Sequence, residues 1–295
     1  MGRRRLHGRC PDRAVRRHHR RGGQGRRLVT GRQDLDYAGL LRLDGRTHVV
    51  VGVGPGIGRE TACALAAAGA HVVCVDVDPA QASAVAEATG GTAATCDVTE
   101  PGRFDRVLSD TARRTGRIDG VTDVVGLVRW TPLAGTGDDD WAWQDGIVAG
   151  QAVRVLRTAV PYLRAGGGGS LTFIASVSAL ASAPGHGLYG MSKAALLSMV
   201  RTAAVELGPE SIRVNAVSPG ATLTPRMVAD PRFTEAIRDN SARTPLGRLA
   251  SPAHIAAAVL FLSSGLAAHV TGHNLVVDGG LSITWPLARP DHSTV

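Results

Sequence analysis

The chain has 295 residues, of which 44% are hydrophobic and 20% charged, a composition that suits one globular domain with a sizeable core. Its formal charge is +8, but residues 1–32 carry twelve Arg against one acidic residue, so the remainder of the chain is mildly acidic. The longest apolar run, 255–262, is far too short to span a membrane, and the four Cys show neither metal nor disulfide spacing, so we predict a cytoplasmic protein without a metal site.

The first 34 residues form an Arg-rich extension with almost no apolar residues. Such a segment buries too little surface to offset its loss of conformational entropy, so we predict disorder over 1–34. It could be an arm for nucleic acid or another acidic surface, or a nonfunctional extension. We favour the nonfunctional extension, so no nucleic-acid partner is expected. The folded domain is predicted to span 35–285 and a C-terminal tail 286–295.

From residue 47 onward, apolar strand-like runs alternate with helical patterns. Seven strands are predicted, at 48–53, 71–77, 92–96, 120–125, 170–175, 212–217 and 274–277. Six helices are predicted, at 57–68, 79–89, 103–115, 141–163, 189–207 and 252–262. This alternation is typical of βαβ units, so we predict an α/β fold: a Rossmann-type, doubly wound, seven-stranded parallel sheet flanked by helices in a single domain.

A glycine-rich loop, GVGPGIG over residues 52–58, joins the first predicted strand to the first predicted helix. Gly52 would permit the turn, Gly56 would let the backbone approach a phosphate, and Gly58 would let helix and strand pack closely. The helix begins at Ile57, where its N-terminal N–H groups could bind a pyrophosphate. The spacing is GxxxGxG and not the usual GxGxxG, so an ordinary glycine-rich turn is the alternative.

An acidic residue, Asp76, closes the second predicted strand eighteen residues after Gly58. A carboxylate at this position can bind the adenosine ribose hydroxyls of a dinucleotide and would repel a 2′-phosphate. No Lys or Arg stands in the glycine loop or at the next residue, Val77, so we predict NAD as the cofactor. The alternative is that Asp76 only begins a turn.

One cation stands out, because the chain contains 32 Arg and a single Lys, Lys193. It lies four residues after Tyr189, one of only three Tyr, and this spacing places both side chains on one face of a helix. In isolation the pair could be a buried phenol beside an exposed ammonium.

Together these motifs resemble the short-chain dehydrogenase/reductase family, over residues 43–280. The family has a glycine loop, a YxxxK helix and a Ser thirteen residues before the Tyr, which is Ser176 here. The resemblance implies that Tyr189 is the acid/base for hydride transfer between nicotinamide and an alcohol or ketone. Lys193 would lower the pKa of Tyr189 and hold the nicotinamide ribose, and Ser176 would stabilise charge on the substrate oxygen, with Ser178 as a second candidate for that role.

The resemblance implies further cofactor contacts and an assembly. Asp97 and Val98 would contact the adenine. Gly126, which follows the fourth predicted strand, would also belong to the cofactor site. The remaining implied contacts are with the nicotinamide, from Pro219, Gly220 and Thr224. A homotetramer would form partly through the helices at 141–163 and 189–207.

Two departures from the family pattern put parts of this mechanism in doubt. The segment 123–126 reads DVVG where the family has Asn-Asn-Ala-Gly, so the sheet-stabilising Asn side chains are absent. The family's fourth catalytic residue, an Asn, is also missing, because Ala149 or Gly150 stands at its position. The polar residues nearby that could substitute for it are Gln144, Asp145 and Gln151.

The segments expected to line the substrate cleft are 128–143, 177–188 and 223–246, at the carboxyl side of the sheet. Trp130, Trp141 and Trp143 would line an apolar cleft or pack in a core or interface, and the acidic run 138–140 is predicted to cap a helix. A neutral, moderately apolar alcohol or ketone is therefore favoured. The alternatives are a 3-oxoacyl thioester reductase, which generally prefers NADP, and a catalytically weak NAD-binding sensor or scaffold.

Overall fold

The strands of this chain are short runs rich in Val, Thr and Ala, and the central ones are buried on both faces. The computed structural model describes residues 35–284. The predicted disordered extension 1–34, the predicted tail 286–295 and residue 285 lie outside the described residues.

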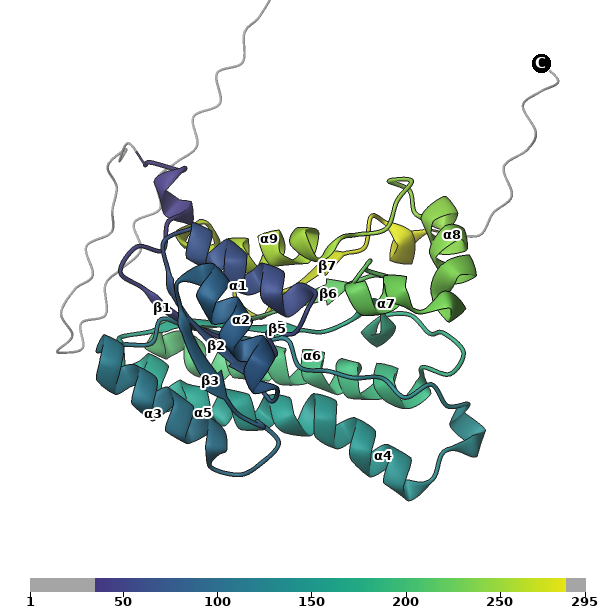
Figure 1. The fold of residues 1–295 in the computed structure, drawn as a ribbon, viewed down its shortest axis with the longest axis horizontal. Helices are drawn as coiled ribbons and strands as arrows, with labels where there is room; N and C mark the ends of the chain where they lie inside the picture. Colours follow the sequence, from purple (N-terminus) through teal and green to yellow (C-terminus); the bar gives the residue numbers. More distant parts are fainter. Residues whose placement is uncertain (1–34, 285–295) are drawn as a thin grey trace, which may run out of the picture. The chain divides into compact units, whose positions relative to one another are not determined.

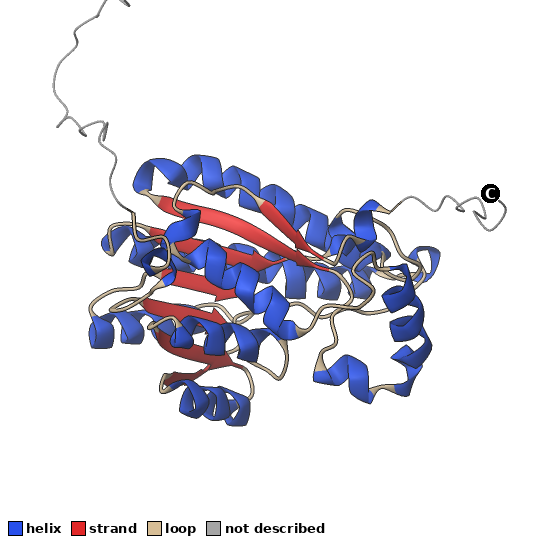
Figure 2. Cartoon of the chain, turned by 90° about the horizontal axis from the view of Figure 1, so that it is seen from above, coloured by secondary structure: helices blue, strands red, loops and turns tan. Residues whose placement is uncertain are grey.

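Seven strands form one parallel sheet in the order β3-β2-β1-β4-β5-β6-β7 (Figures 1 and 2). They are β1 Thr47–Val51, β2 His71–Asp76, β3 Thr92–Thr95, β4 Gly120–Asp123, β5 Gly169–Ile174, β6 Ile212–Pro219 and β7 Asn274–Val277. The order reverses between β1 and β4, which leaves a crevice at the carboxyl ends of these strands where α/β proteins bind ligands. The predicted fold class is confirmed, and each predicted strand is present within three residues at either end.

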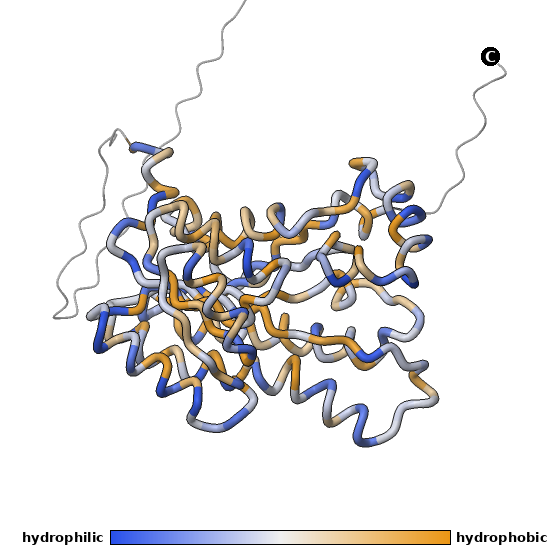
Figure 3. Tube along the Cα trace, viewed as in Figure 1, coloured by the Kyte–Doolittle hydropathy of each residue, from blue (hydrophilic) through white to orange (hydrophobic). Residues whose placement is uncertain are grey.

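Helices cover both faces of the sheet. They are α1 Ile57–Ala67, α2 Pro79–Thr89, α3 Arg103–Thr115, α4 Asp138–Asp145, α5 Gln151–Ala165, α6 Gly187–Leu207, α7 Pro225–Ala229, α8 Thr234–Arg243 and α9 Pro252–Ser263. The helices α3, α5 and α6 pack on one face, whereas α1, α2 and α9 pack on the other. Successive side chains of β1 point to opposite faces of the sheet, which explains this arrangement. Val49 and Val51 pack on the face covered by α3, α5 and α6, and Val50 packs on the other face. Figure 3 shows the hydrophobic residues gathered along the central strands.

One predicted helix, 141–163, is interrupted by a π-helical turn at Gly146–Gly150 between α4 and α5. Glycine at both ends weakens the α-helical preference of this segment, and π turns of this kind often occur at functional sites. The turn lies where the resemblance places the missing Asn.

Two helices, α7 and α8, are absent from the prediction. Both follow β6 and lie beyond the carboxyl ends of the strands (Figure 1). None of their residues is buried, so neither helix has the apolar stripe from which a helix is recognised in a sequence. Within residues 35–284, no helix has the length and apolar character needed to cross a membrane.

Candidate active site

The backbone of the glycine loop after β1 packs directly against the first turn of α1. Gly52 and Gly56 have φ angles of +84° and +134°, which side chains other than glycine rarely adopt. A Cβ atom on Gly58 would lie 1.8 Å from the carbonyl oxygen of Gly52, so only glycine allows this contact between helix and strand. The N–H groups of Arg59 and Glu60 bond the carbonyl oxygens of Gly54 and Gly56, so Ile57 and Gly58 offer the N–H groups that a ligand could use.

A cavity of about 890 Å³ extends from this loop across the carboxyl ends of β2, β3 and β4. Eight of the predicted cofactor residues line it: Gly52, Ile57, Gly58, Asp76, Val77, Asp97, Val98 and Gly126. The lining also includes Gln81, Arg154 and Arg226, which the sequence analysis did not single out. Arg226 lies two residues after Thr224, and this proximity is the signal that could have identified it.

Asp76, at the end of β2, faces the glycine loop and also begins a turn. Its Oδ2 atom would lie 3.8 Å from a Cβ atom on Gly54, whereas its Oδ1 atom accepts a hydrogen bond from the backbone N–H of Asp78 at 3.0 Å. Both interpretations of this residue from the sequence are therefore compatible with the geometry.

Pro219, Gly220 and Thr224, at the end of β6 and just after it, lie outside the lining of the cavity, and Thr224 lies close to the glycine loop. Thr224 caps α7 by accepting a hydrogen bond from Met227, and its Cγ2 atom would lie 3.4 Å from a Cβ atom on Gly56. Gly220 packs so tightly on Asp278 that a Cβ atom would lie 2.7 Å from the Cβ of that residue. Pro219 is the last residue of β6.

The structure brings the three predicted catalytic residues together at the end of β5. Ser176 follows β5, and its Oγ atom accepts a hydrogen bond from the N–H of Ser178 at 3.0 Å. Tyr189 lies in the first turn of α6, and the nearby hydroxyl group of Ser176 favours its charged form. The Lys193 Nζ atom donates to the carbonyl oxygen of Ile174 at 2.6 Å and lies 5.7 Å from the centre of the Tyr189 ring.

These residues adjoin the cavity through Gly126, where a Cβ atom would lie 2.7 Å from Lys193 Nζ. A side chain at this position would have to displace the ammonium group of Lys193. Burial raises the pKa of Tyr189, and the nearby hydroxyl group of Ser176 offsets part of this rise. The family resemblance implies that Lys193 lowers this pKa, whereas burial of the phenol is the largest influence on it here.

Burial lowers the pKa of Lys193 to about 8, against the opposing negative charge of Asp123. Asp123 ends β4 at the first position of the altered Asn-Asn-Ala-Gly segment, and it is only 2% exposed. Burial raises the pKa of its carboxyl group to about 6, against hydrogen bonds from Gln151 and Val125 and the charge of Lys193. The carboxyl group of Asp123 and the ammonium group of Lys193 therefore share one buried region, close to Ser176 and Tyr189.

The three polar residues considered as substitutes for the missing Asn have different positions. Gln151 is fully buried and donates from Nε2 to Asp123 Oδ2 at 2.9 Å, while its Oε1 atom has no partner among residues 35–284. Gln144 holds the loop before α4 by bonding Leu127 and Arg129. Gln151 is therefore the substitute that reaches the region of Lys193, through Asp123.

An aromatic group lies beside Tyr189. The rings of Trp130 and His186 have centroids 3.9 Å apart, those of His186 and Tyr189 5.5 Å, and those of Trp130 and Phe233 6.3 Å. Trp130, His186 and Phe233 each come from one of the three segments predicted to line the substrate cleft. His186 was not identified from the sequence, although it lies three residues before Tyr189.

The other two Trp residues have separate environments. Trp143 lines the cavity and stacks under the guanidinium of Arg129, 4.0 Å from its ring centroid, while Trp141 is exposed on α4. The acidic run forms the first turn of α4, where Asp140 accepts a hydrogen bond from the N–H of Gly137, and Gly137 is the N-cap in place of the predicted acidic residues.

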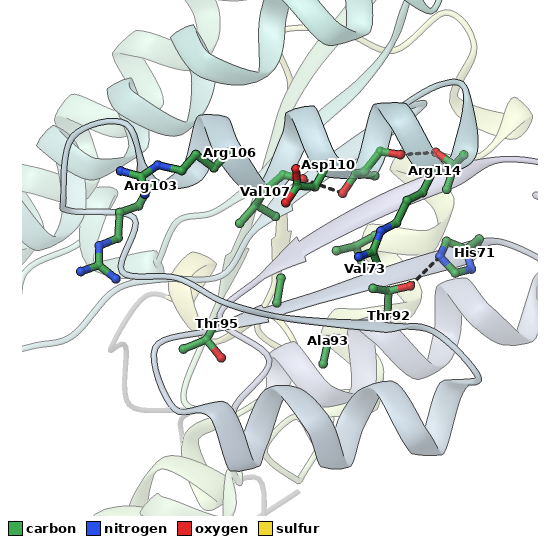
Figure 4. A pocket seen from close by; sticks show the side chains of 13 residues that line it. His71, Val73, Thr92, Ala93, Thr95, Arg103, Arg106, Val107, Asp110 and Arg114 are labelled. Carbon is green, nitrogen blue, oxygen red and sulfur yellow. Dashed lines mark hydrogen bonds between the residues drawn. The ribbon is translucent and has the colours of Figure 1, made fainter.

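A second hollow, of about 310 Å³, lies between the edge strand β3 and α3 (Figure 4). Its lining includes the exposed side chains of Arg103, Arg106 and Arg114, and a hydrogen bond joins His71 to Thr92 at one end. None of the predicted site residues lies in it.

Comparison with known proteins supports the same fold. A family model described as enoyl-(acyl carrier protein) reductase matches residues 52–282. The 3-oxoacyl-(acyl-carrier-protein) reductase FabG of Thermotoga maritima is 31% identical over 249 residues, which are 82% of this chain and 100% of that protein. The 2,3-dihydro-2,3-dihydroxybenzoate dehydrogenase of Bacillus subtilis is 32% identical over 254 residues, 82% of this chain and 97% of that protein.

Among solved structures, a 7α-hydroxysteroid dehydrogenase in complex with NADH and 7-oxo glycochenodeoxycholic acid superposes with a TM-score of 0.77. It is 32% identical, and the match covers 83% of this chain and 98% of that one. The matched family model spans most of the described residues, and the matches to the relatives cover more than four fifths of this chain. The chain therefore belongs to the short-chain dehydrogenase/reductase family, whose members are oxidoreductases that act on CH–OH groups.

Proposed function

We propose that the chain is an NAD-dependent oxidoreductase that transfers a hydride between nicotinamide and a secondary alcohol or ketone. The observation that carries this proposal is the meeting of Ser176, Tyr189 and Lys193 at the end of the nucleotide cavity, beside Gly126. When bound, the nicotinamide supplies or accepts the hydride. The chain itself has to bind both reactants, hold the substrate oxygen and move one proton.

The cavity fits a dinucleotide in both size and chemistry. Its volume of about 890 Å³ lies in the range of small-molecule sites, and it runs from the carboxylate of Asp76 to the neighbourhood of Lys193. The glycines of the loop leave room for phosphates at the start of α1, while Asp97 and Val98 line the cavity near β3. Pro219, Gly220 and Thr224 are proposed to border the nicotinamide.

The proposed proton transfer involves the paired hydroxyl groups of Ser176 and Tyr189. In the direction of carbonyl reduction, the raised pKa keeps Tyr189 protonated, which is the form that donates a proton to the substrate oxygen. Ser176 would stabilise the charge that develops on that oxygen. In the direction of alcohol oxidation, the ammonium of Lys193 favours the phenolate that accepts the proton.

Turnover can be tested by following reduced nicotinamide absorbance with NAD or NADP, a panel of secondary alcohols and ketones, and an acetoacetyl thioester. Turnover of an alcohol or ketone with NAD supports the proposal. Preference for the thioester with NADPH would favour a 3-oxoacyl thioester reductase, the activity named for the Thermotoga relative. Binding of NAD without turnover of any compound would instead indicate a sensor or scaffold.

The preference for NAD depends on Asp76, so replacing this residue with Ala is expected to weaken NADH binding by about tenfold. Discrimination against NADPH should fall further, because the variant no longer presents a carboxylate to the 2′-phosphate. Fluorescence titration with both reduced cofactors measures the two changes. Asp78→Ala is the matched control, since Asp78 caps α2 through the N–H of Ala80 and does not line the cavity. An unchanged NADH to NADPH ratio in Asp76→Ala would contradict the assignment.

We also propose a cytoplasmic homotetramer. Apolar side chains on α5 and α6 remain exposed in the single chain, among them Val153, Met191 and Val205, of which Val205 is 79% exposed. Covering such residues between subunits would remove apolar surface from water. Light scattering is expected to give four times the mass of one chain, and a monomer would contradict the proposal.

A further inference from the structure

His186 occupies an unusual position immediately before α6. It lies one turn before Tyr189, and its Nδ1 atom lies 3.0 Å from the Oγ atom of Ser178. The ring of Trp130 covers the imidazole at a centroid distance of 3.9 Å. Two residues from the loop between β5 and α6, which also carries Ser176, therefore form a polar pair beside the ring of Trp130.

One nitrogen of this imidazole has no partner. The Nε2 atom of His186 is shielded from solvent, and no donor or acceptor within residues 35–284 bonds to it. Burial also lowers the pKa of His186, so the ring is neutral near physiological pH. A buried polar atom without a hydrogen bond is costly, and in a binding cleft this cost can be relieved by a ligand.

The chemistry of the pair restricts the group that can bind there. When Ser178 donates to Nδ1, Nε2 carries the proton and donates; when Nδ1 donates to Ser178, Nε2 accepts. A hydroxyl group can bond in either case, since it both donates and accepts. A carbonyl or ether oxygen fits only the first case, and a methylene group fits neither.

The pair of Ser178 and His186 lies near the hydroxyl group of Tyr189, beside which the reacting carbon of a substrate would lie. The centroids of the His186 and Tyr189 rings lie 5.5 Å apart, and Ser178 lies two residues after Ser176, whose Oγ atom bonds its N–H. A group bound at Nε2 is therefore within the length of a small molecule from the hydroxyl of Tyr189.

We propose that Ser178 and His186 form a second polar subsite, which binds a hydroxyl group on a carbon near the reacting carbon. The preferred substrates are then diols and hydroxy ketones, and simple alcohols are poor substrates. This inference rests on the proposed function, since it takes the oxygen beside Tyr189 as the one that reacts. Trp130 and Phe233 would cover the apolar part of such a substrate.

The test compares butane-2,3-diol with butan-2-ol, which differ by one hydroxyl group, with each stereoisomer measured separately. For the wild-type protein, kcat/KM for the preferred diol is expected to exceed that for the simple alcohol by about tenfold or more. In His186→Phe, which keeps a ring against Trp130 but has no nitrogen atoms, this ratio should fall close to one. Ser178→Ala should lower the ratio by a smaller factor, because the imidazole remains.

Equilibrium binding provides a second readout that needs no turnover. Calorimetric titration of both alcohols into the protein with NADH present should show tighter binding of the diol to the wild type but not to His186→Phe. Equal affinities for the two alcohols in the wild type, or an equal loss of both in the variant, would overturn the subsite. Absence of turnover with every alcohol would contradict the proposed function, while the binding result would still decide the subsite.

Discussion

Replacing Tyr189 with Phe is expected to reduce kcat by roughly 10²–10⁴-fold while leaving the affinity for NADH almost unchanged. The substitution removes only the phenolic oxygen, which would give a proton to the substrate or take one from it. Tyr189 lies outside the lining of the nucleotide cavity, so the binding of the dinucleotide should persist. Steady-state kinetics and a fluorescence titration with NADH measure the two effects separately.

Tyr162→Phe provides a matched control for this prediction. Tyr162 lies on α5, and its hydroxyl donates to Asp105 at 2.9 Å, away from the predicted catalytic residues. This variant should keep the turnover of the wild type. Turnover by Tyr189→Phe close to that of the wild type would exclude Tyr189 as the acid/base and would also contradict the proposed mechanism.

The fold was largely predictable because its signals are local. β1 is Thr-His-Val-Val-Val followed by a glycine loop, and α2 begins with Asp78 as cap and Pro79 at its first position. Such patterns depend on neighbouring residues and can be recognised in one sequence. α8 has no buried residue, and the π-helical turn before α5 depends on packing, so neither has an equally clear local signal.

The candidate site was predicted in part, and what was missed depends on contacts between distant residues. The Tyr189–Lys193 spacing is visible in the sequence because both residues lie on one helix. The hydrogen bond between Asp123 and Gln151 joins residues 28 positions apart, on a strand and a helix. His186 was missed for a similar reason, since its contact with Trp130 depends on how the loop after β4 meets the loop after β5.

The buried pair of Lys193 and Asp123 leads to a prediction about both activity and stability. Replacing Lys193 with Met is expected to reduce turnover by roughly 100-fold or more, because the phenolate of Tyr189 is no longer stabilised by a neighbouring positive charge. It also leaves the carboxyl group of Asp123 buried without an opposite charge. The free energy of unfolding should therefore fall where Asp123 is charged, because a buried carboxylate without a nearby opposite charge is unfavourable.

The loss of stability should depend on pH. Burial raises the pKa of Asp123 to about 6 in the folded protein, above its ordinary value of 3.8. The folded state therefore binds more protons than the unfolded state between these values, and the free energy of unfolding falls as the pH rises through them. Without Lys193 the folded pKa of Asp123 rises further, so Lys193→Met should lose stability relative to the wild type as the pH increases above about 6. Urea denaturation at several pH values measures this difference.

A second substitution separates the two roles of Lys193. Asp123→Asn combined with Lys193→Met removes the unpaired carboxylate, so the double variant should recover most of the lost stability and lose its pH dependence. It should remain inactive, because the cation beside Tyr189 is still absent. Asp119→Asn is the matched control for the carboxylate, since Asp119 is equally buried but pairs with Arg117 at the other end of β4. Recovery of turnover in the double variant would mean that Lys193 acts only by neutralising Asp123, and its proposed role beside Tyr189 would be wrong.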